Sequence, residues 1–212
     1  MDMENKMGTM PVRKLILHMS WPMMLSMLIQ ALYNMVDSIF VAQISEDAFL
    51  ALSLVYPVQM LMIAVCVGTG VGVNAVLSRR LGEGDREKAG VVALNGFLLY
   101  FLTWAAFVVL SLTVGRGFMG LFTDDPVVAR YGLDYMTIVT VFSLGMCMQF
   151  SAERVMQATG NPKGPMIVQG IGAVVNLILD PIFIFEHVGP IPGLNLGVAG
   201  AAIATVLGQF VG

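Results

Sequence analysis

Two aspartates, Asp37 and Asp180, stand inside long runs of apolar residues. Placing a charged side chain at the centre of a membrane-spanning helix costs roughly 2.5–3.5 kcal/mol of insertion free energy. Each carboxyl group must therefore face a polar cavity, pair with a cation or take up a proton. If the two groups lie together, they are suited to exchanging a proton for another cation. A second interpretation is that Asp37 is a hydrogen-bonded, inert group near a wet helix end.

Two neutral residues add oxygen atoms to this pair. Asn176 precedes Asp180 by four residues, so both side chains project from one face of a helix. Pro181 has no N–H to offer the carbonyl of Leu177, which leaves that acceptor free. With Thr205, these residues predict an oxygen-rich site, and oxygen ligands suit hard cations such as Na⁺.

The elements that carry these residues are predicted to be membrane-spanning helices. Only 12% of the 212 residues are charged, whereas soluble domains average about 25%. Uncharged stretches of the length that a bilayer requires alternate with short charged ones. We expect an all-α membrane protein, a six-transmembrane-helix bundle. Its approximate helices are 14–43, 50–78, 90–114, 128–152, 164–186 and 197–212, the last one truncated.

The basic residues divide unequally between the connections. One side is predicted to hold nine of them: Lys6, Arg13, Lys14, Arg79, Arg80, Arg86, Lys88, Arg154 and Lys163. The other side holds Arg116 and Arg130. Because cytoplasmic loops are enriched in Lys and Arg, the first side is predicted to be cytoplasmic and to include the N-terminus. At about 1.5 Å per residue, Asp37, Asp180 and Thr205 then share a level roughly 9–12 Å below the external boundary.

Other polar or adaptable residues lie close to these positions in the sequence. The candidates for lining a substrate cavity are Gln30, Tyr33, Asn34 and Met35 on the first helix. Gln149 and Glu153, near the cytoplasmic end of the fourth segment, could line or gate the inner cavity or simply be solvated at the interface. Cys66 and Cys147 lie within apolar runs, and a disulfide between them requires their helices to touch.

Five segments in order resemble those of MATE (multidrug and toxic compound extrusion) transporters, and of bacterial multidrug exporters in particular. The first-helix signature is similar to Tyr33–Ala42, and the basic loop between helices two and three is similar to Ser78–Ala89. The loop after helix four resembles Gln157–Lys163. Helices five and six resemble Asn176–Phe185 and Gly197–Thr205.

The resemblance implies a twelve-helix fold of two six-helix lobes in the bacterial plasma membrane. A cavity between the lobes exports amphipathic organic cations, including drugs, in exchange for H⁺ or Na⁺, without any other cofactor. By resemblance the amino-lobe cation site comprises Asp37, Asn176, Asp180 and Thr205, with Ala201 contributing a carbonyl. These residues except Ala201 would be the Na⁺ ligands of a sodium-coupled protein, and Asp37 would titrate.

The chain departs from the family in length, because it contains the amino-terminal lobe only. The expected partners are membrane lipid, cationic small molecules and the missing carboxyl-terminal lobe of the same polypeptide, and no nucleic acid. We expect that the fragment alone does not transport and is not an enzyme.

Two other functions compete with cation export. A flippase for lipid-linked saccharides usually has a more strongly basic central cavity, whereas the basic residues of this chain are predicted to lie in loops. An intramembrane aspartyl protease has characteristic Tyr-Asp and Gly-x-Gly-Asp sequences around its two catalytic aspartates. Here Val36 precedes Asp37 and Leu179 precedes Asp180, so this pattern does not match. ATP is not the expected energy source, because there is no Walker motif.

Overall fold

Nearly all of the chain is helical in the computed structural model, which describes residues 10–188 and 190–211. The helices in chain order are α2 (Val12–Ala42), α3 (Glu46–Gly82), α4 (Arg86–Phe122), α5 (Pro126–Val141), α6 (Leu144–Ala158), α7 (Lys163–Ile184) and α8 (Gly197–Val211). A short antiparallel hairpin of β1 (His187–Val188) and β2 (Ile191–Pro192) connects α7 to α8. This hairpin is absent from the sequence-based expectation.

The helices have the lengths and the outer surface of membrane spans. Four of them, α2, α3, α4 and α7, are each long and apolar enough to cross a membrane, and there are five such spans if the bent pair of α5 and α6 counts as one. α8 is a shorter apolar helix of 15 residues. Large apolar side chains cover the outside: Leu17 is 71% exposed and Leu121 is 83% exposed. An exposed apolar surface of this kind suits lipid, and the predicted fold class, an all-α membrane bundle, is confirmed.

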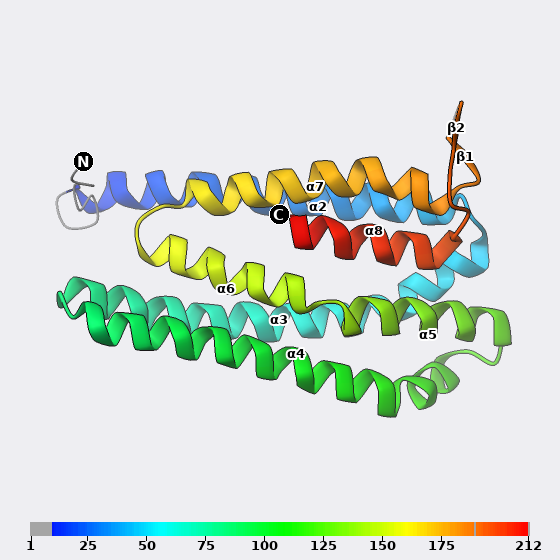
Figure 1. Cartoon of the computed structure of the whole chain (residues 1–212), viewed down its shortest axis with the longest axis horizontal. Helices are drawn as coiled ribbons and strands as arrows, with labels where there is room; N and C mark the ends of the chain where they lie inside the picture. The colour runs from blue at the N-terminus through cyan, green and yellow to red at the C-terminus, as the bar shows by residue number, and fades with distance from the viewer. Residues whose placement is uncertain (1–9, 189, 212) are drawn as a thin grey trace.

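The connections lie at two opposite ends of the bundle (Figure 1). The start of α2, the α3–α4 turn and the α6–α7 loop lie at one end, which we call the basic end. It carries Arg13, Lys14, Arg79, Arg80, Arg86, Lys88 and Lys163. The α2–α3 turn, the α4–α5 loop and the β-hairpin lie at the other end, the hairpin end. Lys6 lies outside the described residues.

The fourth apolar segment is two helices and not the single helix expected over 128–152. α5 and α6 meet at an angle of 44°, with the break at Phe142 and Ser143. The Thr140 hydroxyl donates to the carbonyl of Met136 at 2.7 Å, and the Ser143 hydroxyl donates to the carbonyl of Thr140 at 2.7 Å. Hydroxyl side chains that bond to main-chain carbonyls in this way commonly bend helices.

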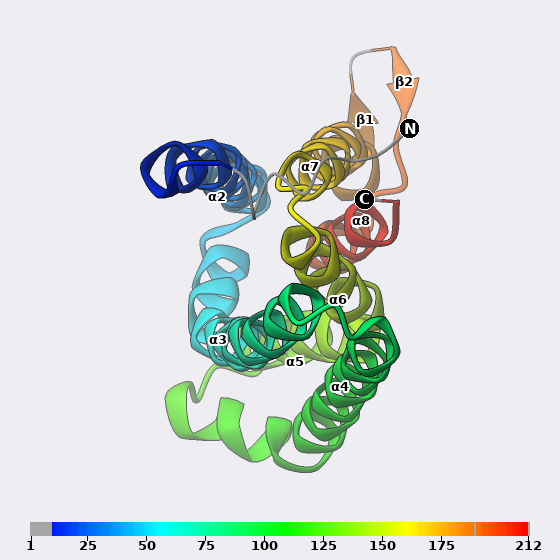
Figure 2. The same ribbon diagram turned by 90° about the vertical axis from the view of Figure 1, so that its left-hand side faces the viewer.

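The helices form two groups (Figure 2). One group contains α2, α7 and α8, and the other contains α3, α4, α5 and α6, with α5 and α6 also in contact with α8. Near the hairpin end the groups share an apolar core that includes Val41, Val55, Tyr135, Ile184 and Ala202. The core fixes the positions of α2, α7 and α8 around the polar residues on them.

Glycine lets α8 approach α7 closely. A Cβ atom added to Gly200 would lie 2.6 Å from the carbonyl carbon of Phe183 and 3.1 Å from the nitrogen of Ile184. Both are main-chain atoms, which cannot turn aside as a flexible side chain can. By contrast, a Cβ atom added to Gly72 in α3 would have no neighbour within 4 Å.

We therefore expect Gly200→Ala to destabilise the protein by about 1–3 kcal/mol, the usual cost of an overpacked contact. Gly72→Ala should leave stability unchanged or slightly improved, because alanine favours helix. Thermal unfolding of the two purified variants in detergent measures the difference. Equal melting temperatures would contradict the close approach of α8 to α7.

Candidate functional site

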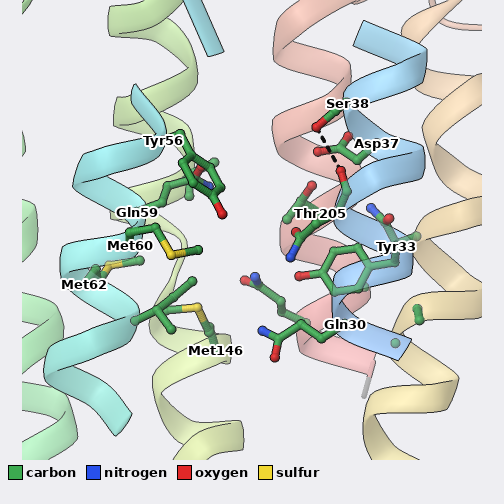
Figure 3. Close-up of a pocket in the computed structure, with 18 of the residues that line it drawn as sticks. Gln30, Tyr33, Asp37, Ser38, Tyr56, Gln59, Met60, Met62, Met146 and Thr205 are labelled. Atoms are coloured by element: carbon green, nitrogen blue, oxygen red, sulfur yellow. Dashed lines mark hydrogen bonds between the residues drawn. The ribbon is translucent and has the colours of Figure 1, made fainter. Parts of the chain in front are cut away.

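A cavity of about 340 Å³ lies between the two groups of helices. α2, α7 and α8 form one wall, and α3, α5 and α6 form the other (Figure 3). The volume falls in the range of small-molecule sites, roughly 300–1,000 Å³. Polar side chains lie mainly on the first wall, while Met60, Met62 and Met146 contribute thioethers on the second.

Asp37 points into this cavity from α2. Asp37 is only 6% exposed. Its Oδ1 atom is buried and has no hydrogen-bond partner among the described residues. Leaving such a group without a partner costs about 1–3 kcal/mol, and more when it is charged. Asp37 is thus a carboxyl group that a proton, a cation or water would stabilise.

Asp180 and Asn176 lie on α7, the helix against which α2 packs. The Asn176 Nδ2 atom donates to Asp180 Oδ1 at 3.1 Å. Asp180 is fully buried, and its second oxygen, Oδ2, has no partner among the described residues. Asn176 lines the cavity, so it connects the buried Asp180 to the cavity that Asp37 enters. The spacing of four residues positions the pair as the sequence predicts.

Thr205 reaches the cavity from α8. It is 6% exposed, and its hydroxyl Oγ1 is buried without a partner among the described residues. Gly208 lies one turn further on and touches α7: a Cβ atom there would lie 2.9 Å from the carbonyl oxygen of Gly172 and 3.0 Å from Asn176 Cβ. This contact holds Thr205 and Asn176 in one cavity.

Ala201 lies one turn before Thr205 on α8 but does not line the cavity. It is fully buried in the apolar core beside Ile184 and Ala202. Its side chain therefore has a packing function in the contact between α8 and its neighbours.

Three unpaired oxygens, Asp37 Oδ1, Asp180 Oδ2 and Thr205 Oγ1, thus come from three helices. Oxygen ligands of this kind suit H⁺ or a hard monovalent cation. The described residues contain no group of three or more His, Cys, Asp or Glu side chains that could hold a metal ion. Reversible binding of a small cation is what this arrangement can do.

The four residues of α2 expected to line a substrate cavity divide into two sets. Gln30, Tyr33 and Asn34 line it together with Asp37. Met35 does not, and its side chain is 62% exposed on the outer surface. Successive residues of a helix are about 100° apart, so Met35 lies on nearly the opposite face from Asp37.

The sequence analysis missed several polar residues of the cavity on both walls, although it named Gln149 of the second wall as a candidate. Tyr56 and Gln59 on α3, Tyr135 on α5 and Gln169 on α7 all line the cavity. The two glutamines carried a usable signal, because an uncharged amide within an apolar helix also needs a partner. The tyrosines gave no such signal, because aromatic residues are common in membrane helices.

Comparison with known proteins places this arrangement in a family. The MatE family model matches residues 22–182, which is most of the chain. The chain is 28% identical over 201 residues to a protein named FAD transporter from Shewanella oneidensis, covering 95% of the chain and 44% of that protein. It is 25% identical over 202 residues to the probable multidrug resistance protein NorM from Thermotoga maritima, covering 95% of the chain and 43% of that protein.

A solved structure has the same fold. It is described as the outward-facing conformation of a multidrug resistance MATE family transporter of the MOP superfamily. It matches with a TM-score of 0.84 and 28% identity, over 92% of this chain and 42% of that one. The chain thus spans less than half the length of the relatives that it matches. Because the family model covers most of its residues, and because its helices superpose on those of a MATE transporter, the chain belongs to the MATE family of multi-pass membrane transporters.

Proposed function

We propose that the protein containing this chain is a secondary antiporter that exports amphipathic organic cations, including drugs, in exchange for H⁺ or Na⁺. The charge of the residues that line the cavity is the observation that supports this proposal. Asp37 lines it, and no Lys, Arg or His side chain does so among the described residues. A cavity with negative charge and no positive charge favours cations over anions. Its apolar thioether and aromatic surface suits the hydrophobic part of such molecules.

The coupling ion would bind at the polar residues of α2, α7 and α8. Asp37 would gain and lose the proton. Asp180, which accepts a hydrogen bond from Asn176, would be coupled electrostatically to Asp37. Asn176 and Thr205 would add neutral oxygens. If the ion is Na⁺, these side chains would be its ligands, with the Ala201 carbonyl nearby on α8. The unpaired oxygens of Asp37, Asp180 and Thr205 support this proposal.

The orientation and location follow from the distribution of charge. The basic end would face the cytoplasm of a bacterial cell, because Lys and Arg are retained on that side of the plasma membrane. The N-terminus would then be cytoplasmic, and Asp37 and Thr205 would lie in the half of the bundle nearer the outside. The apolar outer surface would contact lipid.

An anionic substrate is the second candidate, because a relative is named FAD transporter. FAD carries phosphate groups, which bind best to arginine, lysine or helix N-termini. The cavity lining of this chain has none of those basic side chains in the described part. The same reasoning disfavours a flippase for lipid-linked saccharide phosphates.

We expect Asp37→Asn and Asp180→Asn each to lower ion-driven efflux of a fluorescent cation on the order of tenfold or more, because each removes an ionisable buried group. Efflux of ethidium from vesicles containing the full-length protein measures this loss. Imposing a pH gradient and a Na⁺ gradient separately identifies the coupling ion.

Asp134→Asn is the matched control. Asp134 has a 55% exposed side chain and lies 3.9 Å from Arg130, so it is an aspartate on the same fold outside the cavity. It should retain efflux. A loss as large as that of Asp37→Asn would show that any aspartate removal impairs the protein, which would contradict the proposed site.

We expect the same vesicles to transport ethidium and not FAD, because the cavity lacks basic groups for phosphate. Loading the vesicles with each compound in turn and following its fluorescence outside them compares the two. Coupled transport of FAD, with ethidium unmoved, would overturn the proposal of cation export in favour of the anionic alternative.

We also expect residues 1–212 alone to be inactive in export, since they span less than half the length of the relatives. The remaining wall of a cavity between two lobes would come from the carboxyl-terminal lobe. Reconstituting this segment by itself in vesicles checks the expectation, with full-length protein as the control. Gradient-driven ethidium export by the segment alone would refute it.

A further inference from the structure

A third buried carboxylate lies outside the site described above. Glu153 is on α6 and only 2% exposed. α6 runs from the middle of the bundle toward the basic end, so Glu153 lies on the basic-end side of the cavity (Figure 1). A carboxylate enclosed in a membrane bundle is costly and therefore points to a function. Nothing in the proposed ion coupling uses it.

Both carboxyl oxygens of Glu153 accept hydrogen bonds from amide groups. Gln149 Nε2 donates to Glu153 Oε1 at 3.1 Å, and Gln169 Nε2 donates to Oε2 at 3.3 Å. Each oxygen therefore accepts a bond from an amide, and each keeps a second lone pair that can accept another. Glu153 has no ion-pair partner within 4 Å among the described residues. The partners of this carboxyl group in the described part of the chain are therefore amides, with no ion pair.

The neighbouring cation is turned away from this carboxylate. Arg154 Nη1 donates to Gln157 Oε1 at 2.8 Å. The Arg154 side chain also lies against α3, where its Nε atom would be 2.8 Å from a Cβ atom added to Gly70. Adjacent residues point about 100° apart on a helix, which explains why these two neighbours face different surroundings.

The two glutamines separate Glu153 from the cavity. Gln149 and Gln169 both line it, as does Gln30 on α2. The Gln169 Oε1 atom is buried and has no hydrogen-bond partner among the described residues. An unpaired acceptor thus lies beside a carboxylate that has acceptor capacity left, at the wall of a cavity of about 340 Å³.

Glu153 and its two glutamines are well separated from Asp37 and Asp180. Gln169 precedes Asn176 by seven residues on α7, and Gln30 precedes Asp37 by seven residues on α2. Seven residues of helix rise by roughly 10 Å. The cavity is therefore lined by Asp37 at one level and, about two helical turns closer to the basic end, by the glutamines in front of Glu153 at a second level.

We propose that Glu153, held by Gln149 and Gln169, is a second cation-binding carboxylate of this cavity, and that it binds the N–H groups of an organic ammonium substrate. The inference rests on the proposed export of organic cations and assigns the residue that recognises their nitrogen. An ammonium N–H pairs with the Gln169 Oε1 acceptor and with a free lone pair of Glu153. The glutamine side chains turn slightly to admit it.

The donors around Glu153 explain why an ammonium group fits better than Na⁺. A bare hard cation needs several oxygens around it. Here two amide N–H groups already point at the carboxylate, and their positive ends oppose a metal ion. A molecule that brings its own N–H donors uses the remaining acceptors without displacing those amides.

The test compares two cations on the purified full-length protein. Proflavine carries N–H groups on its cationic ring system, and tetraphenylphosphonium is a cation without any. We expect Glu153→Gln to raise the Kd of proflavine about tenfold or more, the value of a charge-assisted hydrogen bond. The Kd of tetraphenylphosphonium should change by at most about fivefold, because only a more distant charge is lost. Its retained binding also shows that the variant is folded.

Two further variants complete the design. Gln169→Met removes the unpaired acceptor and should weaken proflavine binding by about fivefold. Glu87→Gln, an exposed acid near the start of α4 at the same end, removes the same charge and should leave both Kd values unchanged.

Each outcome decides between the proposals. Unchanged proflavine binding in Glu153→Gln, or equal losses for both cations, would overturn the contact with Glu153 and leave the proposed export of cations standing. If the wild-type protein bound and exported neither cation, the proposed function would fail, and the inference with it.

Discussion

A carboxylate between apolar helices needs hydrogen-bond donors, a cation or a proton, because the surrounding side chains and lipid supply none of these. This constraint governs the arrangement of α2, α7 and α8. Asp180 receives one bond from Asn176, and Asp37 opens onto the cavity. Neither is fully paired within the described part of the chain. Their incomplete pairing fits the ion exchange that we propose, whereas a buried ion pair that only holds helices together would be fully paired.

Close helix packing makes this polar group possible. Gly200 lets α8 touch the main chain of α7, and Gly208 brings α8 against Asn176. Small residues at such contacts are the usual way for membrane helices to approach one another. With a larger residue at either position, Thr205 would move away from Asn176 and Asp180. The apolar core around Val41 and Ile184 holds the same helices from the hairpin end.

Much of the polar site could be predicted from sequence, because its signals are local. The spacing of four residues between Asn176 and Asp180 fixes their common face, and a charge within an apolar run identifies Asp37. α2 and α7 run in the same direction through the bundle (Figure 1). Asp37 and Asp180 each lie a few residues before the last residue of their helix, so they lie at similar levels. Met35 was expected at the cavity from its proximity in sequence to Asp37, but helical rotation turns it outward.

What could not be predicted depends on contacts between distant segments. The hydropathy of 128–152 is continuous, so nothing in it separates a straight span from the bent pair of α5 and α6. The hydroxyls of Thr140 and Ser143 occur in many unbent helices, and only the packed structure reveals that they bond to the main chain here. Glu153 was open to two interpretations, because its burial depends on Gln169 from α7.

The bend between α5 and α6 connects these observations. α5 directs Tyr135 and Val139 into the cavity, and α6 directs Met146 and Gln149 into it after the chain has turned by 44°. Cys147, next to Met146, instead faces α3, where its sulfur lies 3.8 Å from that of Cys66. Because the direction changes at Ser143, α6 can pack against α3 on one side and present Gln149 to the cavity on another. The second wall therefore depends on a break in the helix, as the first wall depends on the glycines of α8.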